Sequence, residues 1–408
     1  MINELRKFYK NTAVVIVFCL AIILSICMPF LFIYNYETCD YSNGKEVIVS
    51  GLKAFKYEKE HLKNVSGILT TDKLNEVLDF YRAKKNSNNG DDGDLNIEYK
   101  YPQMVSIITQ AYTPFGGKTI DVSKIDNAND FYSKNVQRVK EKIELTYDKS
   151  ISSKEKQEAL NKASNIEGPY NLEFMNQWPI LIKSLLFVYI VIVLSAILIS
   201  SGLFSFEKEN NMDIILNSAG KRKLIRVGFN KIFALLSYLT VEFLICTSIT
   251  SLIIFALIGK SGWDSQIQLL SQFITVIYNW TIGKMFIWYL IIAWISILSI
   301  AAIGSLINAI FQELYSSSII MLILMITPIF LRDSSLFTIG LKKFIYIQPI
   351  NGISLLHFID NLFIYNVGSF EMLSAHMILI VSLVYLFIGI IFSPIVFSKR
   401  IGKQLINR

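Results

Sequence analysis

Six long apolar blocks run through the chain, and polar segments separate them. A block of about 18 or more apolar residues is long enough to cross a bilayer as a helix, whereas helices of soluble cores are shorter and keep a polar face. The pattern therefore predicts a multi-pass membrane protein whose membrane part is all-α. The predicted spans are Thr12–Tyr34, Ile180–Phe204, Phe229–Ile258, Met285–Ile310, Ile319–Leu331 and Met372–Phe397.

The first and fifth blocks are the least regular. Arg6, Lys7 and Lys10 precede the first block, as basic residues precede a secretory signal. Its apolar core is longer than the roughly 7–15 residues of a signal sequence, so we predict a retained helix. The fifth block is short and contains Pro328. We expect it to begin within the serine run 316–318 or to continue beyond the block.

The chain divides into three parts on this pattern. Residues 1–34 form the N-terminus and first span, residues 35–178 a domain outside the membrane, and residues 179–408 a five-helix membrane domain. Alternating and helix-period patterns predict an α+β, helix-rich fold for the middle part. Its predicted elements are strands at Glu46–Ser50 and Leu95–Tyr101, helices at Asp72–Lys85 and Asn129–Leu145, a capped helix from Ser152 to Ala163, and a flexible loop at Asn86–Asp94.

Two segments of the membrane domain are neither spans nor short loops. Residues 205–231 are charged with an apolar centre. Residues 344–363 are apolar but interrupted by Pro349 and Gly352. Such an interruption is typical of a re-entrant or interfacial element, here at the outer face.

The distribution of charged residues predicts how the chain is oriented in the membrane. The 408 residues are 53% hydrophobic and carry a net charge of +7, while residues 35–177 hold 20 Lys and Arg against 22 Asp and Glu. The excess of basic residues lies at the chain ends and in residues 205–231, and such an excess marks cytoplasmic segments. We therefore predict that both termini are cytoplasmic and the large domain is extracellular. The Lys-, Ile- and Asn-rich composition is compatible with a low-GC bacterium, so the expected location is the bacterial plasma membrane. The basic surface would face anionic membrane lipid, and no nucleic-acid partner is expected.

The sequence offers little catalytic chemistry. It has no serine–histidine–aspartate set and no metal-binding spacing of its four cysteines and three histidines, so neither an enzyme nor a metal site is predicted. Gly117-Lys118-Thr119 resembles the end of a phosphate-binding loop, but Tyr112 stands where the first glycine is required. We expect this chain to bind no cofactor.

Glu242 lies near the middle of the third predicted span. A carboxyl group at that depth is costly if it faces lipid, so it should face protein or a water-filled cavity. Two interpretations remain open. The residue belongs to a substrate or proton pathway, or it is a neutral, hydrogen-bonded packing residue.

Residues 205–231 carry a family resemblance. Acids open the segment, an apolar triplet follows, Ser218-Ala219-Gly220 forms a turn, and basic residues close it, ending at Lys231. This order resembles the membrane subunits of ABC-2 type ABC transporters, although Asn211-Met212 stands where Gly-Thr is usual. The resemblance assigns contact with an ATPase to Glu207, Glu209, Asp213, Ile214, Ile215, Leu216, Arg222 and Lys223.

The six-helix layout with a large domain after the first span is also similar to that family. The resemblance implies the permease subunit of an ATP-driven exporter, working with two separate ABC ATPase subunits that bind ATP and Mg. It also implies a second permease subunit, either an identical copy or a paralogue. The expected substrate is an antimicrobial peptide, a lipid or a drug, and ions remain possible because some members with this layout are linked to sodium export.

Other functions remain open. A membrane sensor or immunity protein whose outer domain binds a ligand would need no ATPase. A permease of the FtsX-like type also has a domain after its first span but has four spans. Residues 205–231 alone are also compatible with an amphipathic helix lying on the membrane surface.

Overall fold

The computed structural model describes residues 2–40, 47–63, 65–87, 101–147, 151–206, 221–332, 337–368 and 370–404. Within these ranges, six helices are long and apolar enough to cross a membrane, which confirms the six predicted spans and indicates a membrane protein. They are α2 (Thr12–Tyr34), α9 (Gln177–Gly202), α12 (Lys221–Leu257), α13 (Ile282–Phe311), α14 (Leu314–Leu331) and α17 (Ser374–Gln404).

The bounds of α14 differ from the prediction. The helix begins at Leu314, before the serine run, and ends at Leu331. The serines continue the helix because their hydroxyls bond backward: Ser317 Oγ donates to the carbonyl of Glu313 at 2.6 Å, and Ser318 Oγ donates to that of Leu314 at 2.8 Å. The serine hydroxyls thus have hydrogen-bond partners within the helix, and the span starts earlier than the hydropathy pattern predicted.

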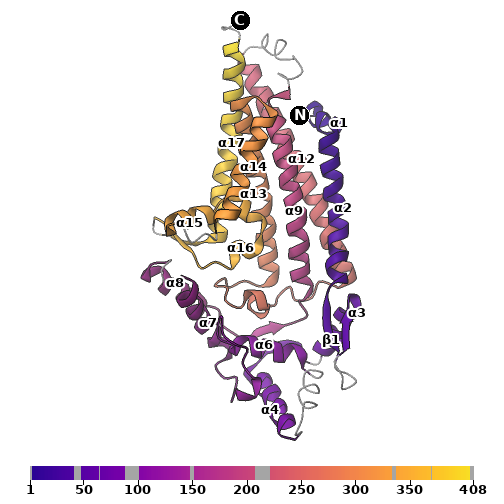
Figure 1. Ribbon diagram of the computed structural model, residues 1–408, viewed down its shortest axis with the longest axis vertical. Helices are drawn as coiled ribbons and strands as arrows, with labels where there is room; N and C mark the ends of the chain where they lie inside the picture. Colours follow the sequence, from indigo (N-terminus) through magenta and orange to yellow (C-terminus); the bar gives the residue numbers. More distant parts are fainter. Residues whose placement is uncertain are drawn as a thin grey trace.

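The six helices form a bundle in which α9 and α13 are the most buried and α2 and α14 the least (Figure 1). Small residues bring the helices close together. A Cβ atom at Gly304 of α13 would lie 2.1 Å from Ser200 Oγ of α9, and one at Gly389 of α17 would lie 2.5 Å from Ala302 of α13. Close approach of this kind is how helices associate within a bilayer, where apolar burial alone gives no driving force.

A short amphipathic helix, α1 (Ile2–Lys10), precedes the first span and was not predicted. Phe8 of α1 is buried and packs edge-on against Tyr238 of α12, with ring centroids 5.8 Å apart. Asn11 then accepts the amide of Ala13 at 3.0 Å and caps α2. The helix lies at the same end of the bundle as both chain termini (Figure 1), which we call the termini end.

Residues 35–176, which we call the inserted domain, lie at the opposite end of the bundle, the domain end (Figure 1). Among its described residues, the domain is mostly helical with two small antiparallel sheets. Its helices are α3 (Leu52–Leu62), α4 (Thr71–Ser87), α6 (Pro102–Tyr112), α7 (Lys134–Lys142) and α8 (Ser153–Ser164). Strand β1 (Glu37–Asp40) pairs with β2 (Val47–Ser50), and β3 (Gly67–Leu69) pairs with β4 (Tyr170–Leu172).

Several predicted elements of this domain are confirmed. Strand β2 and helix α4 occupy two of the predicted ranges, and Ser152 and Glu155 form the predicted capping box at the start of α8. The helix predicted at Asn129–Leu145 is instead three pieces, a 3-10 turn, α7 and a π-helical turn. Of the predicted strand Leu95–Tyr101, only Tyr101 is described, and it directly precedes α6; residues 88–94 of the predicted loop also lie outside the described ranges.

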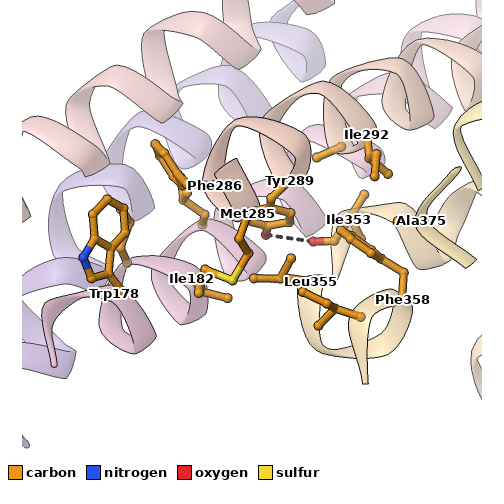
Figure 2. Close-up of a cluster of buried hydrophobic side chains, with 14 of the residues drawn as sticks. Trp178, Ile182, Met285, Phe286, Tyr289, Ile292, Ile353, Leu355, Phe358 and Ala375 are labelled. Atoms are coloured by element: carbon orange, nitrogen blue, oxygen red, sulfur yellow. Dashed lines mark hydrogen bonds between the residues drawn. The ribbon is translucent and has the colours of Figure 1, made fainter. Parts of the chain in front are cut away.

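The interrupted segment between α14 and α17 contains α15 (Ile339–Tyr346), a 3-10 turn η6 (Pro349–Ile353) and α16 (Leu355–Ile359). The turn is buried among the helices. In Figure 2, Tyr289 of α13 points at it and donates a 2.9 Å hydrogen bond to the carbonyl of Ile353. A Cβ atom at Gly352 would lie 2.2 Å from Ser296 Oγ, so any side chain there would displace Ser296 and loosen the packing of the turn against α13. A hairpin of β5 (Ile364–Val367) and β6 (Phe370–Leu373) then leads into α17.

Candidate functional site

Asn308 joins three helices at the termini end. Its side chain is fully buried near the end of α13. Its Oδ1 accepts the backbone amides of Phe204 at 2.6 Å and Ser205 at 3.1 Å, directly after α9. Its Nδ2 donates to the carbonyl of Ser201 and, at 3.2 Å, to Ser317 Oγ of α14. One amide group therefore holds the end of α9 to both α13 and α14.

Lys231 makes the corresponding contact from α12. Its side chain is 1% exposed, and its Nζ donates a 2.8 Å hydrogen bond to the carbonyl of Leu203. The same ammonium group lies 3.7 Å from a carboxylate oxygen of Glu4 in α1. Because a carbonyl at a helix C-terminus lacks its intrahelical partner, a cation is well placed there. Lys231 thus connects α1, the end of α9 and the start of α12.

Together, Asn308 and Lys231 fix both ends of the predicted coupling segment. We call these two residues and their partners the termini-end junction. Of the residues assigned to coupling, Arg222 and Lys223 lie exposed in the first turn of α12. The remaining ones are outside the described residues: Glu207, Glu209, Asp213, Ile214, Ile215 and Leu216. Sequence reasoning missed Asn308, whose only signal was an amide within an apolar block.

A cavity of about 320 Å³ adjoins the junction. It is bounded by α1, the first turn of α2, the last turns of α9, Lys231 of α12 and Leu314 of α14. Its lining is mostly apolar, but Glu4, Lys7 and Lys231 contribute charged groups. Lys7 pairs with Glu4 at 3.0 Å. The cavity is within the size range of ligand-binding sites in proteins.

Glu242 is fully buried between α12 and α9. Its Oε2 accepts a 2.9 Å hydrogen bond from Ser195 Oγ, whereas its Oε1 has no hydrogen-bond partner among the described residues. The neighbouring Val241 and Leu244 are exposed, so α12 turns its apolar face outward and its carboxyl group inward. The predicted orientation toward protein is therefore observed, and the half-satisfied carboxyl group remains a candidate for function.

Lys142 anchors the inserted domain to the bundle. It is 4% exposed at the end of α7. Its Nζ donates to Asp360 Oδ1 at 2.7 Å and to the Asp360 carbonyl at 2.6 Å, and it bonds Thr275 Oγ1 at 3.1 Å. Burial lowers the pKa of Lys142, and the adjacent Asp360 opposes that shift. The ammonium group therefore touches both the α12–α13 connection and the α14–α17 connection.

Further polar contacts reinforce this docking. Lys343 of α15 pairs with Glu155 of α8, and Lys154 pairs with Glu371 of β6 at 3.1 Å. Two hydrogen bonds join the inserted domain to the α12–α13 connection. The backbone amide of Asn171 donates to Gln266 Oε1 at 2.9 Å. The backbone amide of Gly262 donates to the Glu173 carboxylate at 2.7 Å. The inserted domain is thus attached to both connections at the domain end.

Glu58 forms a buried cluster where α2 enters the inserted domain. Its carboxylate accepts the hydroxyl of Tyr36 at 2.9 Å and the side-chain amide of Asn176 at 2.7 Å. Burial raises the pKa of Glu58, and the hydrogen bonds from Asn176 and Tyr36 oppose that shift. The cluster joins α3 to the residues that follow α2 and precede α9.

Comparison with known proteins does not assign the chain to a family. The resemblance to ABC-2 permeases rests on residues 205–231 and on the order of the helices. No protein-family model matches the sequence, and no match is found among curated proteins or solved structures.

Proposed function

We propose that the chain is the permease subunit of an ATP-driven exporter of the ABC-2 type, which couples to a separate ATPase through residues 205–231. The termini lie in the cytoplasm, and the inserted domain lies outside the cell. The observation that carries the proposal is the termini-end junction. In this proposal, an ATPase that displaces residues 207–220 also displaces α9, α13 and α14, which Asn308 joins. It displaces α1 and α12 through Lys231.

Such coupling requires that movement of the ATPase changes the relative stability of two arrangements of the helices. A segment attached through buried hydrogen bonds transmits displacement, since breaking those bonds leaves buried polar groups unsatisfied at about 1–3 kcal/mol each. The ATPase supplies ATP and Mg, and two permease chains form the substrate path. The substrate class that fits a buried carboxyl group within apolar helices is an amphipathic peptide, lipid or drug.

Affinity purification of the full chain in mild detergent tests this function. A stoichiometric ATP-binding subunit should copurify. Ile214→Asp should release it, whereas Ile48→Asp, a matched change at an exposed position of the inserted domain, should not. Purification of the chain without an ATPase, from membranes that show no associated ATP hydrolysis, would contradict the proposal.

A sensor or immunity protein is the second candidate, and the docking of the inserted domain favours it. Lys142 and Lys343 tie that domain to helix connections, so ligand binding outside could move the helices. This function predicts that the chain purifies without an ATPase and that Ile214→Asp leaves ligand response intact. The same purification therefore separates the two candidates.

A further inference from the structure

We propose that the cavity at the termini end binds an anionic phospholipid from the adjacent leaflet, with its headgroup at Lys7 and Lys231. Lys7, Lys231 and Glu4 are the charged residues that line the cavity. Their formal net charge is +1, which one phosphodiester group would neutralise. Basic pockets between membrane helices are general sites for such headgroups.

Two of the cavity residues lie on the same face of α9 as a stripe of exposed apolar side chains. Leu198 and Gly202 line the cavity. One and two turns further along the same helix face, Leu194 and Ile190 are 45% and 43% exposed, and Phe187 is 43% exposed. The spacing of three or four residues places all five positions on one face of α9.

The length of the stripe matches one lipid tail. From Leu198 to Phe187 the helix rises about 16 Å at roughly 1.5 Å per residue. One leaflet of a hydrocarbon core is about 15 Å thick, half of the roughly 30 Å bilayer core. A phospholipid with its phosphate at the lysines would therefore lay an acyl chain along this face of α9.

The position of the cavity fits a lipid better than a soluble anion. It lies at the end of six apolar helices, beneath the amphipathic helix α1, whose Phe8 is buried and whose Arg6 and Lys10 are exposed. An amphipathic helix of this kind lies in the plane of the membrane surface. The cavity is thus at headgroup depth. The lipid site does not depend on the proposed transport function.

Native mass spectrometry of the purified full chain with added lipid tests the site. Phosphatidylglycerol should bind at least about fivefold more tightly than phosphatidylcholine with the same acyl chains. Both lipids carry the phosphodiester, but the choline cation cancels its charge, and the attraction of a basic residue to net anionic lipid is about 1 kcal/mol. Glycerol 3-phosphate should bind far more weakly, because it lacks the tails. Equal binding of the two lipids, or glycerol 3-phosphate as potent as the lipid, would overturn the assignment.

Two matched pairs of variants locate the site. Lys7→Gln should weaken phosphatidylglycerol binding about fivefold, whereas Lys10→Gln on the same helix should change it less than about twofold. Leu198→Trp, which enlarges a side chain that lines the cavity, should remove most bound lipid, and Val241→Trp on the exposed face of α12 should not. Equal effects within either pair would show diffuse surface attraction and would refute the site. An unchanged elution volume in size-exclusion chromatography confirms that each variant is folded.

Discussion

The Nζ atom of Lys231 lies 2.8 Å from the carbonyl oxygen of Leu203, so α12 is hydrogen-bonded to the end of α9 across the segment that separates them in sequence. Both residues are buried, and Glu4 of α1 supplies the nearby negative charge. This contact ties α12 directly to the end of α9, independently of the segment that joins the two helices in sequence.

Lys231→Met should destabilise the protein. The change leaves the buried Leu203 carbonyl without its donor, at a cost of about 1–3 kcal/mol, whereas Glu4 keeps its ion pair with Lys7. Thermal unfolding in detergent, followed by tryptophan fluorescence, measures the effect. Lys223→Met, at an exposed position of the same helix, should change stability by less than about 0.5 kcal/mol. Equal stability of the two variants would show that the contact contributes nothing.

Asn308→Ala should loosen the end of α9 selectively. The amides of Phe204 and Ser205 lose their acceptor, and the carbonyl of Ser201 loses a donor. Loss of about 1.4 kcal/mol of local stability corresponds to tenfold faster amide exchange. Hydrogen exchange with mass spectrometry should therefore show at least about tenfold faster exchange in the peptide covering these residues.

Ile307→Ala is the neighbouring control for that experiment, since its partly buried side chain makes apolar contacts rather than hydrogen bonds to the α9 end. It should leave exchange at Phe204 and Ser205 within about twofold of the wild type. Unchanged exchange in Asn308→Ala would rule out the proposed role of the amide.

Glu242→Gln should leave the fold intact and impair transport. Glutamine has nearly the same shape, and its carbonyl oxygen can still accept the hydroxyl of Ser195. It cannot titrate or carry charge, so a substrate or proton pathway through this residue should slow by about tenfold or more, or about 1.4 kcal/mol of barrier. Uptake into proteoliposomes with the ATPase partner measures the rate. Unchanged uptake would leave Glu242 as a packing residue.

The Glu58 cluster predicts a pH dependence of stability. Since burial raises the pKa of Glu58 in the folded protein, the folded state holds the proton more tightly than the unfolded chain. The resulting stabilisation is complete below about pH 4, the ordinary pKa of glutamate, and is lost as pH rises through the raised pKa. The melting temperature of the wild type relative to Glu58→Gln should therefore fall as pH increases over this range.

Glu60→Gln on the same helix is the matched control, because its side chain is exposed. Its melting temperature should follow that of the wild type across the same pH range. Parallel curves for the wild type and Glu58→Gln would contradict a role of Glu58 in the pH dependence.

The membrane helices could be predicted because a bilayer imposes a long apolar run that hydropathy records directly. Helix ends were harder to predict. Leu314 begins α14 ahead of polar serines because those serines bond to their own helix. Lys221 begins α12 within a charged stretch, ahead of the predicted Phe229, and Lys231 within that stretch is buried against the end of α9. The polarity of a residue in the sequence does not reveal whether its side chain finds a hydrogen-bond partner in the folded protein.

The candidate site was predictable only in part. Glu242 stands out in sequence as a lone acid among apolar residues, and its inward orientation follows from the cost of facing lipid. Asn308 and Lys142 do not stand out, since their importance comes from partners about 100 and 220 residues away. The residues from Glu207 to Leu216 lie outside the described ranges, so their role in coupling stays a prediction.

Lys142 binds Thr275 and Asp360 with a single ammonium group, and these two partners belong to different helix connections. A ligand that favours one position of α7 therefore also favours one spacing of the two connections. Thermodynamic reciprocity requires that the spacing, in turn, sets the affinity for that ligand. A ligand of the inserted domain that displaces α7 would therefore be thermodynamically linked to the spacing of these two helix connections.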